Sequence, residues 1–200
     1  MSEPTPMSDE QTFPRTQNLR LGYSVLEDRV WLHLVLTQGQ GTVVTWLPRR
    51  MVVGLAERLG DLLRHSHPAT EGEPAADAVL ALEHQAAHSS LAGRSKNQND
   101  EGDEGAKAAE HDDSLEGSKA HLVSEARVEQ REGHVVIGLL GHLMPTINSV
   151  GDDATPVAGL TLTREQTHEV LRLLVEQVDQ SDWVLPRRLE WLRRPVAPQR

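Results

Sequence analysis

Apolar and polar residues alternate with a period of two near the start of the chain, which predicts β-strands. The alternation covers residues 19–23 and resumes over residues 30–36, and a stretch rich in β-branched residues follows at residues 42–47. From residue 48 the spacing becomes that of an amphipathic helix, with apolar residues three or four positions apart. The apolar stripe of this helix contains Met51, Val52, Leu55, Leu59, Leu62 and Leu63. The pattern therefore predicts a βββα unit.

A similar order of patterns returns in the second half of the chain. Residues 126–129 alternate, residues 135–144 form a nearly unbroken apolar run, and residues 157–162 predict a third strand. Thr163 and Gln166 then match the capping box that begins many helices. The apolar stripe of the predicted helix contains Val170, Leu171, Leu174, Val175 and Val178. This order favours an internal repeat, although helical periodicity by itself forces some agreement between two amphipathic helices.

We expect an α+β fold in which two βββα halves pack around an antiparallel sheet. A helix over residues 75–91 and an acidic disordered linker are expected to join the halves, because the linker is too poor in apolar residues to bury a core. The expected division of the chain is a disordered tail at 1–17, a first unit with its extra helix at 18–92, a disordered acidic linker at 93–119, a second unit at 120–182 and a basic C-terminal tail at 183–200.

The formal net charge of −10 at pH 7 is concentrated in one segment. Residues 71–119 hold twelve Asp or Glu against four Lys or Arg, so the rest of the chain is nearly neutral. This balance disfavours broad phosphate-driven binding, which depends on clustered Lys and Arg. The chain has no Cys, which excludes disulfides, thiolate zinc sites and cysteine nucleophiles.

No apolar run approaches the roughly 20 residues of a membrane-spanning helix, and the first residues lack the basic and apolar regions of a signal peptide. We therefore expect a cytoplasmic protein with no membrane partner. Aromatic residues make up only 3% of the chain, so Leu and Val must fill most of the core.

The strongest candidates for metal binding are His84 and His88, which lie one helical turn apart. No third ligand stands at a fixed spacing from them, and the chain has no nucleophile elbow and no glycine loop for phosphate. The sequence therefore predicts no catalytic residue, no metal ion and no cofactor, and we expect the protein not to be an enzyme. A metal-dependent enzyme built on the two histidines is the alternative.

A possible binding surface stands on the face of the second predicted strand that carries no Leu. Trp31 and His33 lie there, with Arg20 on the neighbouring first strand and Trp46 on the third. Aromatic and basic residues side by side on a sheet are typical of surfaces that stack single-stranded bases. In outline, β-rich units that end in a helix resemble the Whirly and Pur-type single-strand binders. The alternative is that both Trp side chains belong to a sheet covered on both faces.

The end of the chain is rich in arginine beside apolar residues that have helical spacing. Three interpretations stay open: the arginines hold a phosphate backbone, they dock in the groove of a partner, or they extend over their own domain with the charged groups in water. The residues concerned are Arg187, Arg188, Arg193 and Arg194.

One further set of residues resembles a known group of proteins. The set comprises Tyr23, Glu27, Asp28, Arg29, Trp31, Trp46, Leu47, Arg49, Arg50, Leu80, Leu82, Glu83 and His84. It is similar to an uncharacterised group of bacterial proteins with two β-rich halves, over residues 18–92, and this resemblance implies no activity. Our leading functional hypothesis is a non-enzymatic protein-interaction or adaptor protein that binds another protein or a second copy of itself. Single-stranded nucleic-acid binding is the main alternative.

Overall fold

The computed structural model of the protein describes residues 12–37, 39–66, 77–89, 118–145 and 153–193. Within these residues the fold is α+β, with one six-stranded mixed sheet and four helices. The elements are β1 (Thr16–Ser24), β2 (Arg29–Leu36), β3 (Thr42–Leu47), α1 (Arg49–His65), a helix over residues 77–89, β4 (Lys119–Arg131), β5 (His134–Leu143), β6 (Thr155–Leu162), α3 (Arg164–Gln180) and the 3-10 helix η3 (Arg187–Arg193). Most of the predicted linker, residues 93–117, lies outside the described residues.

The strands follow one another across the sheet in sequence order, from β1 at one edge to β6 at the other. All neighbours pair antiparallel except β3 and β4, which pair in parallel from Val43 with Lys119 to Trp46 with Leu122. The predicted antiparallel sheet is therefore wrong at this junction. The reason is the long connection between β3 and β4. It contains α1 and the 77–89 helix, and such a crossover lets β4 run in the same direction as β3. Whether the two halves are a duplication stays a prediction.

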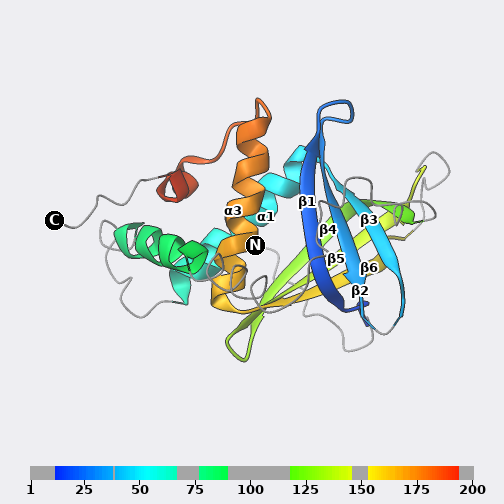
Figure 1. The fold of residues 1–200 in the computed structure, drawn as a ribbon, viewed down its shortest axis with the longest axis horizontal. Coiled ribbons are helices and arrows are strands. Elements are labelled where there is room, and N and C mark those ends of the chain that lie inside the picture. The colour runs from blue at the N-terminus through cyan, green and yellow to red at the C-terminus, as the bar shows by residue number, and fades with distance from the viewer. Residues whose placement is uncertain (1–11, 38, 67–76, 90–117, 146–152, 194–200) are drawn as a thin grey trace, which may run out of the picture.

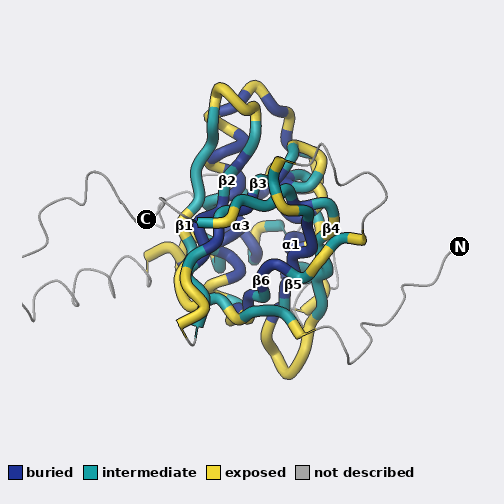
Figure 2. The backbone as a smooth tube through the Cα atoms, turned by 90° about the vertical axis from the view of Figure 1, so that its right-hand side faces the viewer, coloured by how far each residue is buried: buried dark blue, intermediate teal, exposed yellow. Residues whose placement is uncertain are grey.

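The sheet curls until its two edge strands meet at one point (Figures 1 and 2). Arg15 and Gly159 form a parallel bridge, and the Gly159 N–H donates to the carbonyl of Pro14 at 2.7 Å. Figure 2 shows the six strands around a ring, and Figure 1 shows α1 and α3 at one side of the strands. The sheet is thus barrel-like, and the long helices α1 and α3 pack against each other and on its inner face.

Phe13 explains why part of the expected tail is folded. A Cβ at Gly138 would lie 2.6 Å from the Phe13 ring, and a Cβ at Gly159 would lie 2.9 Å from the Cβ of Phe13. These glycines pair across β5 and β6, so they form a flat surface that the Phe13 side chain covers. The tail boundary at residue 17 is therefore corrected: β1 begins at Thr16, and the residues just before it pack on the outer face of the sheet. Residues 1–11 lie outside the described residues.

The core lies between the inner face of the sheet and the two long helices. Its strand residues include Val30, Leu32, Leu34, Val43, Leu47, Val123, Ile137, Leu139 and Leu160. Its helix residues include Leu55, Leu59, Leu63, Leu171, Leu174 and Val178. The apolar stripes that the sequence predicts for the two helices are confirmed by these positions. The capping box is confirmed as well, because the Thr163 side chain and the Gln166 side chain each bond to the backbone of the other residue.

The C-terminal segment is docked on the helices rather than being only a basic tail. Trp183 and Trp191 are buried, at 7% and 2% exposure, and Leu189 of η3 packs on Gly60 of α1. These two tryptophans add large side chains to a core that is otherwise filled by Leu, Val, Ile and Ala. The segment assigned to residues 183–200 is thus part of the core up to η3, and residues 194–200 lie outside the described residues. Within the described residues, no helix is long and apolar enough to cross a membrane.

The docking of η3 predicts opposite effects for two glycines of α1. A Cβ at Gly60 would lie 2.5 Å from Cδ2 of buried Leu189, whereas a Cβ at Gly54 would meet nothing within 4 Å. Gly54→Ala should raise the free energy of unfolding by about 0.5–1 kcal/mol, because alanine favours the helix. Gly60→Ala should lower it by about 1 kcal/mol, because Leu189 has to move within a packed core. Urea denaturation measures both, and an equal gain in the two variants would contradict this packing.

Candidate functional site

The four sheet residues of the predicted binding surface do lie together. Trp31 pairs with Trp46 across β2 and β3, and His33 pairs with Arg20 across β2 and β1. Their strand neighbours Val30, Leu32 and Leu34 belong to the core, so the four side chains stand on the opposite, outer face of the sheet. The sequence thus predicted both the members of this surface and the face that they share.

Trp31 lies over the neighbouring strand at Gly22. A Cβ at Gly22 would be 2.4 Å from Cζ2 of Trp31, so only glycine lets the indole ring approach the β1 backbone so closely. Trp31 and Trp46 are half-buried, Arg20 is exposed, and His33 is buried at 6% exposure. The sequence left two alternatives, a stacking surface and a sheet covered on both faces. Neither is fully met, because the indole rings are neither buried in the core nor fully exposed. We call Arg20, Trp31, His33 and Trp46 the aromatic face.

The C-terminal arginines do not join the aromatic face. Arg188 binds Glu57 of α1 through two guanidinium nitrogens, at 3.0 and 2.6 Å, and Arg193 forms an ion pair with Asp179 of α3. The hydrogen bond to Glu57 raises the pKa of the Arg188 guanidinium. These arginines therefore hold η3 on the long helices. Arg187 is exposed, and Arg194 lies outside the described residues.

A second surface, which the sequence did not predict, is the tip of the β1–β2 hairpin. Val25 and Leu26 are 79% and 98% exposed there, and Val184 beside the docked Trp183 is 74% exposed. The two segments are held together at Asp28, whose Oδ1 accepts hydrogen bonds from the Tyr23 hydroxyl at 2.6 Å and from Trp183 Nε1 at 3.0 Å. We call Val25, Leu26 and Val184 the apolar tip.

The two rings that support the apolar tip pack edge to face. The centroids of Tyr23 and Trp183 are 5.6 Å apart, with an interplanar angle of 83°. The hydrogen bond to the Asp28 carboxylate raises the pKa of the Tyr23 hydroxyl. Asp28 has a positive φ of 48°, which suits a tight turn between two strands. The only sequence signal for this site is a pair of apolar residues, Val25 and Leu26, between two predicted strands.

His84 does not pair with His88, as the candidate metal site would require, but with His168. The His84 ring lies 5.6 Å from the ring of His168 on α3, and both rings contact Trp191 edge to face, at 5.9 and 6.3 Å. His88 points to Glu169 instead, with Nδ1 3.8 Å from the carboxylate. Among the described residues, no group of three or more His, Asp or Glu side chains is placed to hold a metal ion. The pairing of His84 with His168 was missed, because nothing in the local spacing connects two separate helices.

Burial controls the charge of this histidine pair. His168 is 2% exposed, and neither ring nitrogen has a hydrogen-bond partner among the described residues. Its Nε2 is 3.6 Å from Glu83, too far for a hydrogen bond, and that carboxylate accepts one from Arg164 at 2.6 Å. Burial, helped by the positive charge of Arg164 and by His84, lowers the pKa of His168 to about 4. Burial and the charge of Arg172 also lower the pKa of His84.

Comparison with known proteins adds no assignment to these surfaces. No protein-family model, curated protein or solved structure matches this chain.

The neutral His168 predicts a loss of stability in acid. The folded pKa is about 4 against an ordinary value of 6.5, so the unfolded chain binds the proton more tightly. The neutral His168 contributes its full stabilisation when the pH is above the ordinary pKa. The free energy of unfolding then declines, by up to about 3 kcal/mol, as the pH falls toward the pKa of the folded protein. Urea denaturation across this pH range should show that His168→Phe removes most of the decline, whereas His65→Phe, at the exposed end of α1, keeps it. Equal pH slopes in the two variants would contradict the assignment.

Proposed function

We propose that the protein is a non-enzymatic protein-interaction module that binds a partner through the apolar tip. The observation that carries the proposal is the exposure of Val25 and Leu26 on the hairpin turn, and of Val184 on the C-terminal segment that a hydrogen bond joins to this turn. Single exposed apolar residues are common on proteins, but a cluster on a fixed projection is typical of an interaction site. The partner is another protein or a second copy of this chain.

The tip also meets the conditions for tight binding. Asp28 bonds to both the hairpin and the C-terminal segment, so the two segments that carry the apolar side chains are joined before a partner arrives. A preorganised surface loses less conformational entropy on binding than a mobile loop does. Burying Leu26 and Val25 would contribute about 1.5–3 kcal/mol for each side chain. The tip is therefore suited to act as an anchor inside a larger interface.

Replacing the tip residues should remove binding without changing the fold. We expect the double variant Val25→Ser, Leu26→Ser to lose recovery of a stoichiometric partner from native lysate by at least about tenfold, because two apolar anchors are lost. Leu82→Ser is the matched control, since Leu82 is 51% exposed on the 77–89 helix. Sedimentation of the same proteins tests self-association. The proposal is contradicted if the wild type has no stoichiometric partner and is a monomer, or if the double variant retains the partner.

A second candidate function is single-stranded nucleic-acid binding at the aromatic face. The observation in its favour is the Trp31 indole, which lies over Gly22 beside Trp46 and is half-buried. A base can stack on a ring held in this way, and exposed Arg20 is available for a phosphate. The acidic charge of the whole chain, −10, makes this the second choice.

Tryptophan fluorescence tests this second function. If bases stack on the aromatic face, titration with a mixed-sequence oligonucleotide at low salt should quench the emission. Trp31→Leu should then weaken binding by about tenfold, since stacking contributes about 1–3 kcal/mol per base. Leu82→Ser again serves as the control. Absence of quenching in the wild-type protein would exclude the function.

A further inference from the structure

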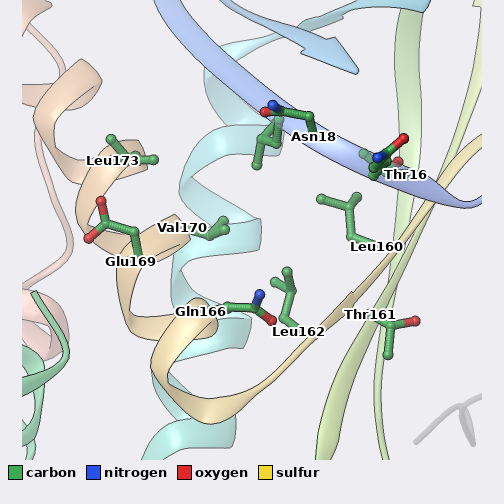
Figure 3. A pocket seen from close by; sticks show the side chains of 11 residues that line it. Thr16, Asn18, Leu160, Thr161, Leu162, Gln166, Glu169, Val170 and Leu173 are labelled. Atoms are coloured by element: carbon green, nitrogen blue, oxygen red, sulfur yellow. The ribbon is translucent and has the colours of Figure 1, made fainter. Parts of the chain in front are cut away.

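A cleft opens where the edge strands of the curled sheet fail to pair (Figure 3). It has a volume of about 390 Å³, which lies within the range of about 300–1,000 Å³ typical of ligand pockets. One wall is the edge of β1 from Thr16 to Leu19, and the other is the end of β6 from Leu160 to Leu162 together with the first half of α3. The cleft therefore begins next to the Arg15–Gly159 bridge and widens from there.

The backbone of both walls offers hydrogen-bonding groups. β1 and β6 are the two edges of the sheet, and they run parallel at their single bridge. On an edge strand, the N–H and C=O groups that point away from the sheet have no strand partner. A segment that runs antiparallel to β1 can add to this edge as a further strand.

The side chains of the cleft favour a segment with an apolar residue. Leu162, Val170 and Leu173 form an apolar floor, and the polar rim comes from both walls (Figure 3). Among the described residues that line the cleft, Glu169 is the only one with a charged side chain, and its carboxylate is already bound by Arg172 at 2.8 Å. The cleft therefore favours an uncharged occupant over a strongly charged one.

Thr16 adds a polar group that lacks a partner. It lines the cleft, and its Oγ1 is buried without a hydrogen bond to any described residue. A buried hydroxyl without a partner costs free energy, and rotation of the Thr16 side chain would let this hydroxyl bond to a backbone amide or carbonyl in the cleft. The four residues of β1 in the wall span about 13 Å, at a rise of about 3.3 Å per residue.

We propose that this cleft binds a short, extended, uncharged peptide segment of another protein by strand addition to β1. About four residues of the segment pair with the β1 edge, which is the length of the wall. One of its apolar side chains inserts between β1 and α3, above Leu162 and Val170. The cleft lies at the opposite end of β1 from the apolar tip, so this proposal does not depend on the tip being an interface.

A tethering experiment tests the site without knowledge of the natural partner. The chain has no Cys, so Gln17→Cys places a single thiol at the exposed rim of the cleft. The probe is the acetylated tetrapeptide Thr-Leu-Thr-Leu, joined to a cysteamine disulfide at its C-terminus. Intact mass spectrometry measures the fraction of the protein that stays joined to the probe in the presence of a competing thiol. Gln180→Cys, exposed near the end of α3, is the matched control.

Two altered probes separate strand addition from simple apolar contact. N-methylation of the backbone amides removes the ladder hydrogen bonds, and Thr-Ser-Thr-Ser removes both apolar side chains. On the Gln17→Cys protein, we expect Thr-Leu-Thr-Leu to be retained at least about tenfold better than either altered probe. The N-methylated probe loses hydrogen bonds, and the serine probe loses apolar contact. On Gln180→Cys the three probes should be retained equally. Equal retention of the three probes on Gln17→Cys, or the same preference on Gln180→Cys, would overturn the proposal.

A second variant tests the floor of the cleft directly. Leu173→Glu, introduced beside Gln17→Cys, adds a carboxylate next to Glu169 and should abolish the preference for the apolar probe. Leu173 is half-buried at the surface of α3, and tryptophan fluorescence checks that the fold is kept. Undiminished preference in a folded Leu173→Glu protein would place the peptide elsewhere and overturn the assignment.

Discussion

The structure depends on one packing interaction: the sheet curls so that its apolar inner face packs against α1 and α3. Each strand places alternate residues on this face, and the helix stripes complete the core. Because the helices lie on the inner side, the outer face has no helix of the described chain to cover it, and this leaves the Trp31–Trp46 pair half-exposed. Because the curl closes at only one bridge, it also leaves an open cleft between β1 and β6. The candidate surfaces on the sheet are thus consequences of how the core is built.

The C-terminal segment connects parts of the fold that the sheet alone does not join. Trp183 reaches the hairpin turn through Asp28, and Trp191 packs against His84 and His168 between two helices. With few aromatic residues in the chain, these two rings fill space that several Leu side chains would otherwise have to fill. A loss of this segment would therefore loosen both the hairpin turn and the docking of the 77–89 helix. The arginines of η3 act in the same direction, since Arg188 binds acidic residues of α1 and Arg193 binds Asp179 of α3.

Local patterns predicted most elements, because periodicity and capping depend only on neighbouring residues. The helix of α3, its capping box at Thr163 and the shared face of Trp31 and His33 are of this kind. What failed depends on contacts between distant residues. The parallel pairing of β3 with β4 is set by the crossover between them, and Phe13 joins the fold only because Gly138 and Gly159 are brought side by side. The nearly unbroken apolar run of residues 135–144 agrees with burial on both faces of β5, because Ile137 and Leu139 lie in the core and Phe13 covers Gly138 on the outer face.

The curl of the sheet also limits where a partner can bind along the edge strand β1. An exposed edge is a risk of aggregation, and proteins shorten or cover such edges. At its start β1 follows the Arg15–Gly159 bridge and contains a register shift between Thr16 and Asn18, and at its end Trp183 packs on Tyr23. The bridge limits the open edge at the start of the strand, and the residues that follow it lie beside the cleft. A wall of four β1 residues is long enough to pair with a few residues of an extended segment.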